Sequence, residues 1–304
     1  MTRYSWVSVR ALMMLGVVLV GTCLAGCGPR HPIAAREKPT VGTSASFKGP
    51  VGLQLWSLRG VLDKDVPAGL KYAHDFGFVD VELAGTYGLS VKDFRAQLDQ
   101  HGLKAVSGHW PFEAFEKDPE AVAREAQELG VTYAGCAWLA DLGPFNEAIC
   151  RRAAKVFNHA GEVLAAHHIQ FFYHNHGYEY VPYGDGTLFD LLMKETRPEL
   201  VCYEMDVFWT VHAGQDPVAL LKKYPDRWRL FHIKDMKKGV QTGKLTGSED
   251  ETNDVAVGTG QINIAKVLRT AQHVGVRYYF IEDESPSASQ QIPQSLRFLE
   301  SLSW

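Results

Sequence analysis

Short apolar runs alternate with longer amphipathic stretches from residue 51 to the C-terminus. The short runs are rich in β-branched and aromatic residues, which predicts strands, whereas the longer stretches place apolar residues at helical spacing. The predicted strands are residues 51–56, 78–83, 103–109, 131–138, 169–174, 200–206, 228–233 and 277–282. The predicted helices are residues 65–76, 90–101, 118–129, 146–167, 187–196, 216–224, 263–274 and 289–302. This alternation is typical of α/β proteins.

Glycines mark several of the predicted junctions between helix and strand. Gly77, Gly102, Gly130 and Gly275 each follow a predicted helix, where glycine commonly ends the helix in the left-handed conformation. Eight strand and helix units in about 250 residues predict a single (β/α)8 TIM barrel over residues 51–304. A doubly wound open sheet is the alternative, but no glycine-rich phosphate loop follows the first predicted strand.

Side chains that commonly bind metals lie where four of the predicted strands end. They are His174, His176, Asp206, His232, Glu282 and Glu284. A parallel barrel gathers the C-terminal ends of its strands at one mouth, so we expect these side chains to share one site. A mixed set of imidazoles and carboxylates suits Mn, Co, Fe or Zn better than Ca or Mg, which prefer oxygen ligands. The predicted ligands of this divalent metal ion are His174, His176, Asp206, His232 and Glu282.

The two histidines of the fifth strand leave one assignment open. Side chains alternate along a strand, so His174 and His176 face the same way if the strand continues through both. One imidazole can then bind the metal while the other binds the substrate. The sequence does not determine which of them is the ligand.

Further polar residues near the strand ends are candidates for catalysis and substrate binding. Glu82, His109 and Glu282 are candidate bases, with a purely structural polar role as the alternative for the first two. Lys234 is a candidate for holding a substrate oxygen, and a solvated lysine paired with Asp235 is its alternative. The candidates for substrate binding are His176, Trp209, Glu284 and Gln54, with Trp209 either a wall for a sugar ring or simple packing.

The N-terminus has the pattern of an export signal. Arg3 and Arg10 precede an apolar run, residues 11–20, that is too short for a convincing membrane span. The run leads to Leu24-Ala25-Gly26-Cys27, which resembles the bacterial lipoprotein processing box.

These features predict a lipoprotein signal peptide over residues 1–26, lipidation at Cys27 and a flexible tether over residues 27–50. The protein would then be exported, anchored to the membrane through the lipid and facing the periplasm. An ordinary signal peptide or a short helical anchor is the alternative.

The charge of the chain bears on its partners, and its cysteines bear on disulfide bonds. The formal net charge is −4, and removal of residues 1–26 would make it about −6 because two arginines leave with them. No basic run occurs in the sequence, so nucleic acid is not an expected partner. Cys136, Cys150 and Cys202 have no paired spacing, so no disulfide framework is expected.

One connection in the predicted barrel is unusually long. Residues 236–260, after the seventh predicted strand, are polar and glycine-rich and lie on the side where the strand ends meet. Loops of this length within a compact domain often have a function. We therefore expect a mobile lid or a substrate loop.

Several motifs together resemble the sugar phosphate isomerase/epimerase superfamily of xylose-isomerase-like barrels, which also includes inosose dehydratases and endonuclease IV. The resemblance covers about residues 50–302. The motifs that carry it are residues 52–59 (GLQLWSLR), 81–85 (VELAG), 173–176 (YHNH), 204–209 (EMDVFW) with Ala213-Gly214, and 232–235 (HIKD).

This resemblance implies a divalent ion, often Mn or Co, held by a Glu, Asp, His, Glu set from strands five to eight. The last three ligands map onto Asp206, His232 and Glu282, whereas His174 occupies the position of the strand-five glutamate. Epimerases of the family use the strand-five and strand-eight glutamates as paired proton carriers, so this chain departs from them. The family's Asp-x-x-His is also absent, because Trp209 stands at its fourth position.

We expect a metal-dependent isomerase or epimerase that acts on a sugar or keto-sugar through an enediolate-type intermediate. A lyase or dehydratase of a keto-sugar or keto-glycoside, like the inosose dehydratases, is the first alternative. A non-catalytic carbohydrate-binding lipoprotein is the second. Endonuclease activity is disfavoured by the acidic balance and by missing ligands for a multi-zinc site.

Overall fold

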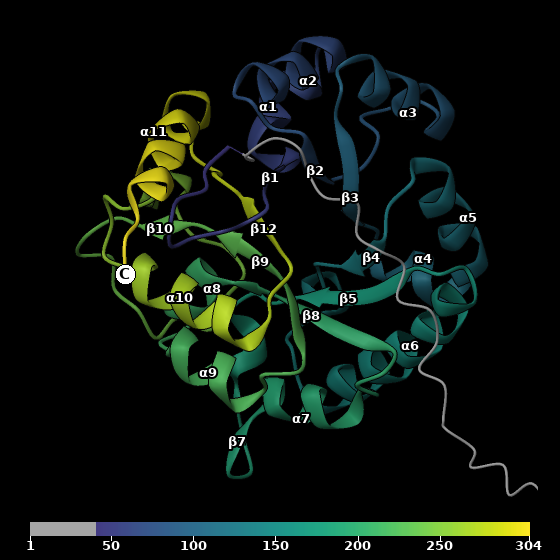
Figure 1. Ribbon diagram of the computed structural model, residues 1–304. Helices are drawn as coiled ribbons and strands as arrows, with labels where there is room; N and C mark the ends of the chain where they lie inside the picture. Colours follow the sequence, from purple (N-terminus) through teal and green to yellow (C-terminus); the bar gives the residue numbers. More distant parts are fainter. Residues whose placement is uncertain (1–40) are drawn as a thin grey trace, which may run out of the picture. The chain divides into compact units, whose positions relative to one another are not determined.

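The computed structural model describes residues 41–304, which form a closed barrel of parallel strands surrounded by helices (Figure 1). The predicted signal peptide, the lipidation site at Cys27 and most of the predicted tether lie outside the described residues. Within residues 41–304, no helix is both long and apolar enough to cross a membrane.

Eight parallel strands close the barrel. Their order around the ring is β1, β12, β9, β8, β5, β4, β3, β2, and β2 pairs with β1 to complete it. Their bounds are β1 Val51–Gln54, β2 Asp80–Leu83, β3 Lys104–His109, β4 Tyr133–Cys136, β5 Gln170–His174, β8 Val201–Asp206, β9 Trp228–Ile233 and β12 Tyr278–Ile281. Each lies within one predicted strand, so the predicted (β/α)8 TIM barrel is confirmed.

Helices connect successive strands and cover the outside of the barrel (Figure 1). The longer helices agree with the predicted ones within one residue at either end. They are α2 Val66–Asp75, α3 Val91–Gln100, α5 Pro119–Leu129, α6 Glu147–Ala166, α7 Leu188–Glu195, α9 Pro217–Lys223, α10 Ile264–Val274 and α11 Ala288–Ser301. The shorter helices and 3-10 turns are η1 Leu55–Leu58, α1 Arg59–Leu62, α4 Phe112–Lys117, η2 Ala140–Leu142, η3 Tyr178–Tyr180, α8 Val207–His212 and η4 Glu251–Asn253.

Local side-chain chemistry sets the ends of these helices. The Ser90 side chain accepts the backbone N–H of Asp93 at the start of α3, and Thr187 forms a capping box at the start of α7. Gly130 and Gly275 end α5 and α10 with φ angles of 78° and 87°, which glycine adopts without a Cβ clash. Because these interactions are between residues close in sequence, the helix ends can be predicted from the sequence.

Alternate residues of the strands point into the barrel and divide its interior into two zones. The lower zone is an apolar cluster of Val106, Tyr133, Phe172, Cys202, Leu230 and Phe280. Two residues further along four of these strands lie His174, Glu204, His232 and Glu282. Side chains two residues apart share one face of a strand, so the apolar floor and the polar zone above it follow from the same alternation.

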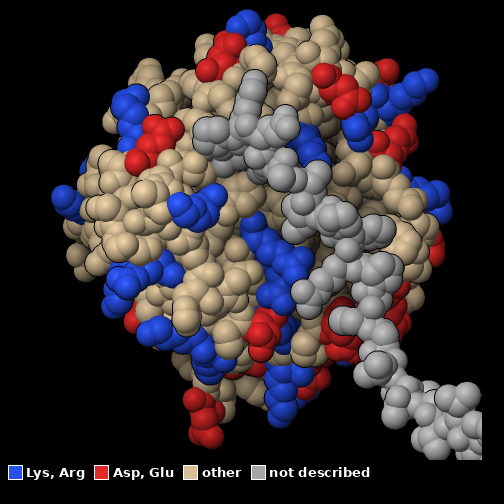
Figure 2. Space-filling view, in the orientation of Figure 1, with Lys and Arg blue, Asp and Glu red and all other residues tan. Residues whose placement is uncertain are grey.

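The outer face of the strands packs against the helices in the main hydrophobic core. Phe171 of β5, for example, lies against Phe157 of α6 with ring centroids 4.9 Å apart. Figure 2 shows acidic and basic side chains intermixed around the rim of one face. Surface ion pairs such as Arg152 with Glu116, 2.6 Å apart, connect neighbouring helices, but solvent screens such exposed pairs and they add little to stability. The buried core therefore dominates the stability.

Residues 41–50, the last part of the predicted tether, pack against the barrel. The Phe47 side chain is fully buried, and its ring meets that of Tyr279 edge-on with centroids 5.0 Å apart. Ser44 Oγ donates to the carbonyl of Leu302 at 2.7 Å. Burial of an aromatic ring offsets the entropy lost in ordering this segment. Ser44 and Phe47, within the predicted tether, therefore pack against the domain.

Two short antiparallel ladders lie outside the barrel. One joins β6 Pro182–Tyr183 to β7 Gly186–Thr187, and the other joins β10 Asp235–Met236 to β11 Asp254–Val255. The second ladder brings together the ends of residues 237–253, which make up most of the segment predicted as a lid. Both ends of that segment are therefore fixed to the barrel.

One charged cluster ties residues 237–253 to α8. Glu249 Oε2 accepts from Lys244 Nζ at 2.6 Å and from His212 Nε2 at 2.7 Å. The His212 carbonyl also accepts the backbone N–H groups of Gly243 and Lys244 at 2.8 and 3.1 Å. The hydrogen bonds from Lys244 and His212 lower the pKa of Glu249 to about 2. An ionised carboxylate thus clamps the middle of the segment.

Removal of the Glu249 carboxylate should loosen this clamp. We expect Glu249→Ala to speed hydrogen–deuterium exchange of Gly243 and Lys244 by about tenfold, because hydrogen bonds to a charged group contribute about 1.5–3 kcal/mol. In the wild type, a folded-state pKa below the unfolded value of about 4.3 stabilises the clamp above that pH. This stabilisation is lost as the pH falls toward about 2.

Glu251→Ala is the matched control in the same segment, since Glu251 pairs with Arg59 at 2.8 Å and not with the clamp. It should leave exchange at Gly243 and Lys244 unchanged. Equal acceleration in both variants, measured by mass spectrometry, would contradict a specific role of Glu249.

Candidate metal and substrate site

The C-terminal ends of the barrel strands bring most of the sequence-predicted site residues together. They are Glu82 from β2, His109 from β3, His174 from β5, Asp206 from β8, His232 from β9 and Glu282 directly after β12. The strand registers place His174 opposite Glu204 and Asp206 opposite His232. His109 is slightly exposed, and the other side chains of this group are buried.

Asp206 lies at the centre of a group with the donor set of a metal site. Its Oδ1 caps α8 by accepting the Trp209 N–H at 2.9 Å, while its Oδ2 is buried and accepts no hydrogen bond from the described residues. Oδ2 is 3.7 Å from both His174 Nε2 and His232 Nδ1, and His232 Nδ1 is 3.0 Å from Glu282 Oε2. Ligand atoms about 2.1 Å from one ion lie about 3.0–3.6 Å apart. Asp206, His232 and Glu282 therefore offer ligand atoms within reach of one divalent ion, and His174 Nε2 lies beside Asp206 as a candidate fourth ligand.

The other ring nitrogen of each candidate histidine ligand meets a buried carboxylate. His232 Nε2 donates to Glu82 Oε1 at 2.6 Å, and His174 Nδ1 donates to Glu204 Oε2 at 3.1 Å. Metal-binding histidines commonly donate their second N–H to a carboxylate, which orients the ring and raises its basicity. Both imidazoles are thus oriented as ligands would be, with their remaining nitrogens toward Asp206.

Glu204 is a site residue that the sequence did not single out. Its Oε2 lies 3.1, 3.2 and 3.3 Å from His174, His109 and His232. These four side chains offer ligand atoms within 4.8 Å of one another and form a second group able to hold a metal. The signal was present, because Glu204 precedes Asp206 by two residues on one strand and therefore faces the same way.

Burial and neighbouring charges set the protonation of the cavity groups. Burial lowers the pKa of His109, but the carboxylate of Glu82 and the hydrogen bond with Glu204 outweigh it, so this pKa is raised above its usual value. Burial raises the pKa of Glu282, but the Lys234 ammonium outweighs it and holds this pKa well below its usual range. The carboxylates thus favour the protonated form of His109, and Lys234 favours the ionised form of Glu282.

Lys234 lies among the carboxylates of the site. Its Nζ is 3.1 Å from Glu282 Oε2 and 3.6 Å from Asp206 Oδ2, and it also pairs with Glu284. Asp235 accepts backbone N–H groups of its own connection, so the alternative pair of Lys234 with Asp235 does not form. The Lys234 side chain is buried and does not line the cavity. Its ammonium therefore compensates the charge of the carboxylates from the side away from the cavity.

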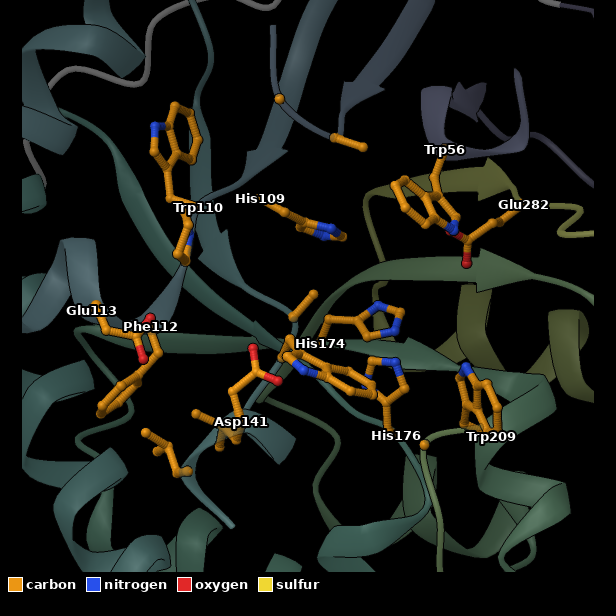
Figure 3. A pocket seen from close by; sticks show the side chains of 18 of the residues that line it. Trp56, His109, Trp110, Phe112, Glu113, Asp141, His174, His176, Trp209 and Glu282 are labelled. Atoms are coloured by element: carbon orange, nitrogen blue, oxygen red, sulfur yellow. The ribbon is translucent and has the colours of Figure 1, made fainter. Parts of the chain in front are cut away.

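A cavity of about 620 Å³ opens above these residues (Figure 3). At its inner end it is lined by His109, His174, His176, Trp209, Glu282 and Glu284. Trp209 is thus part of the cavity wall. Gln54 lies beneath the cavity, where its Nε2 donates to Glu82 Oε1 at 2.7 Å, and it does not line the cavity.

The structure separates the two histidines that the sequence left unassigned. The His176 ring lies within an aromatic group, with centroids 5.0, 5.3 and 5.5 Å from Trp138, Trp209 and Tyr178. Burial lowers its pKa to about 3, so the imidazole is neutral. Neither metal-binding group among the described residues includes it. His174 is therefore the candidate ligand, and His176 is part of the cavity wall.

Inosose dehydratases are among the curated proteins that the sequence matches. The inosose dehydratase of Clostridium tetani (strain Massachusetts / E88) is 31% identical over 100 residues, which cover 32% of this chain and 32% of that protein. The chain spans between about a third and three fifths of the length of the first curated relatives that it matches.

Solved structures share the fold over most of the chain. A sugar phosphate isomerase/epimerase from Parabacteroides distasonis ATCC 8503 has a TM-score of 0.66 and 27% identity, and the match covers 84% of this chain and 95% of that chain. An IOLI protein with a bound zinc atom has a TM-score of 0.64 over 82% of this chain and 95% of that chain. Its identity is 13%, so that likeness concerns the fold alone.

A protein-family model matches most of the barrel sequence. The model described as xylose isomerase-like TIM barrel matches residues 70–302. This range contains seven of the eight barrel strands and every candidate metal ligand. The chain therefore belongs to the xylose isomerase-like TIM barrel family.

Proposed function

We propose that this protein is a divalent-metal-dependent enzyme that removes a proton next to the carbonyl group of a sugar or keto-sugar. The two imidazoles and two carboxylates around Asp206, with further carboxylates against both imidazoles, are the main support. Similar proteins are named as sugar phosphate isomerase/epimerase and as inosose dehydratase. Isomerisation through an enediolate and dehydration next to a carbonyl both start with the loss of such a proton.

His174, Asp206, His232 and Glu282 would hold the ion. When bound, a divalent cation polarises a substrate carbonyl and makes the neighbouring C–H more acidic. Glu282 lines the cavity, and Lys234 Nζ donates to its Oε2, the oxygen that lies 3.0 Å from His232 Nδ1. Its Oε1 is therefore the oxygen available to accept the substrate proton.

Elimination of a β-oxygen is the second candidate reaction, and the cavity offers a specific reason for it. Epimerisation needs a base on each face of the reacting carbon, whereas the strand-five position carries His174, which faces Asp206 and Glu204. His109 lines the cavity, and the carboxylates of Glu82 and Glu204 raise its pKa, which suits it to act as an acid. In an elimination, Glu282 takes the proton next to the carbonyl. His109 then protonates the departing oxygen, which leaves as water or an alcohol with an unsaturated ketone as the other product.

Metal content tests the ion site. We expect the purified protein, dialysed against Mn²⁺, Co²⁺ or Zn²⁺ and then against buffer, to retain about one ion per chain by elemental analysis. His232→Ala and Asp206→Ala should each reduce this to below about a tenth, because each removes a ligand.

His273→Ala is the matched control, since His273 is exposed on α10. It should retain metal as the wild type does, and circular dichroism should show that all variants are folded. A wild-type content below about a tenth of an ion per chain, unchanged by His232→Ala, would sink the metal-dependent proposal.

Solvent isotope exchange tests the base and separates the two reactions. In deuterated water, with inososes, ketoses and 3-keto-glucosides as probes, the wild type should exchange one carbon-bound hydrogen of its substrate. Glu282→Gln should slow this exchange by about 100-fold or more, because it removes the base. The metal content of Glu282→Gln is measured as well. Slow exchange in a variant that retains its metal indicates loss of the base, whereas slow exchange with little metal indicates loss of the ion.

His109→Gln distinguishes elimination from isomerisation. It should preserve exchange and abolish release of water or alcohol if the reaction is an elimination. If product formation survives His109→Gln, the reaction is an isomerisation. Absence of exchange with every carbonyl sugar, in a protein that contains metal, would contradict both reactions.

A further inference from the structure

The cavity continues well beyond the candidate metal site. Trp110, Phe112, Glu113 and Asp141 lie on the other side of His174 from Glu282 (Figure 3). We call this region the outer pocket; it is lined by Trp110, Phe112, Glu113, Trp138, Asp141 and Leu142. The whole cavity of about 620 Å³ is within the range of about 300–1,000 Å³ found for drug-sized ligands. A single sugar ring beside Glu282 would leave the outer pocket empty.

The Trp110 ring is held rigidly in the wall of the outer pocket. Its Nε1 donates to Glu125 Oε2 at 3.0 Å, and its backbone N donates to the Gly135 carbonyl at 2.8 Å. Gly108 makes room for the ring, since a Cβ there would come within 3.1 Å of it. With its only polar atom already bonded, the indole offers the cavity a fixed apolar surface. A fixed ring loses little entropy when a ligand covers it.

Trp138 provides a second aromatic surface, which connects the outer pocket to the inner end. Its ring meets His176 edge-on, with centroids 5.0 Å apart, yet the residue remains 39% exposed. Gly247 of the clamped segment lies against the ring, where a Cβ would come within 2.9 Å. An indole kept partly exposed in a cavity wall retains apolar area that a ligand can cover.

Two carboxylates from separate elements complete the outer pocket. Glu113 belongs to α4 and Asp141 to η2, and both line the cavity. Among residues 41–304, neither side chain has a hydrogen-bond or ion-pair partner. A carboxylate can accept several hydrogen bonds, so both are available to donors of a ligand.

We propose that the outer pocket binds a second sugar ring, so that the substrate is a disaccharide or the end of a longer saccharide. The inference rests on the proposed function, which places the reacting ring beside Glu282. A sugar ring offers a C–H face to the two indoles and hydroxyl donors to Glu113 and Asp141. A phosphate would meet these carboxylates with like charge, and an apolar aromatic group would leave them unused.

Equilibrium binding without turnover tests the second ring. The full-length protein is titrated with glucose, cellobiose, maltose, trehalose and phenyl β-glucoside by isothermal calorimetry. We expect at least one disaccharide to bind about tenfold tighter than glucose, because stacking and hydrogen bonds to charged acceptors add to those of the first ring. Disaccharide binding no tighter than that of glucose, for all three, would overturn the second-ring site.

Paired variants locate the effect in the outer pocket. Glu113→Gln with Asp141→Asn keeps the shape and removes both charges, and it should weaken disaccharide binding by about tenfold while leaving glucose unchanged. Trp110→Ala should do the same, whereas Trp304→Ala, a control at the exposed C-terminal residue, should not. In the opposite outcome, phenyl β-glucoside is bound as tightly as any disaccharide, with an affinity that the double carboxylate variant does not change. That result would overturn the second sugar ring and indicate an apolar group in the outer pocket.

The two proposals fail separately in this design. Preference for a disaccharide that depends on Trp110 and Glu113, without isotope exchange, would support the second-ring site and contradict the proposed reaction. Hydrogen exchange in a keto-sugar, with no disaccharide bound more tightly than glucose, would support the proposed reaction and contradict the second-ring site.

Discussion

Glu82, Glu204, Asp206 and Glu282 carry their carboxylates into the upper half of the barrel, where little water reaches them. A buried charge without a partner costs several kcal/mol, so each carboxylate needs an opposite charge, a hydrogen-bond donor or a metal ion. Imidazoles and the Lys234 ammonium surround them, and most of these cationic or donor groups contact two carboxylates at once. A rotation of one member would therefore break its contacts with several others. The site is therefore held in one geometry before any substrate arrives.

The apolar floor sets the depth of this charged layer. Phe172, Leu230 and Phe280 fill the barrel two residues before His174, His232 and Glu282, so polar side chains are confined to the strand ends. The imidazoles above the floor meet carboxylates of neighbouring strands, as His232 meets Glu82 and His174 meets Glu204. Hydrophobic packing below and charge pairing above thus position the same residues.

The inner and outer parts of the cavity differ in chemistry. The inner end holds closely coupled charges, in which burial and the nearby Glu82 raise the pKa of Glu204 to about 7. The outer pocket has two indoles and two carboxylates without partners among the described residues. The first arrangement suits a cation and proton transfer, and the second suits a hydroxylated ring. One cavity thus combines a reacting end with a recognition end, which agrees with an enzyme of the xylose isomerase-like TIM barrel family.

The sequence by itself determined the eight strands, the helix ends and the strand-end positions of Asp206, His232 and Glu282. Hydrophobic alternation and helix caps act between neighbours in sequence, and parallel strands bring their ends together whatever else the fold does. Only the tertiary structure decided that His174 and not His176 faces Asp206, which histidines Glu204 meets, and that Lys234 pairs with Glu282 and Glu284 and not with Asp235. Those outcomes depend on partners far apart in sequence, such as Glu82 and His232, which are 150 positions apart. Charge pairing between distant strands selects the orientation of each side chain, and no local pattern records it.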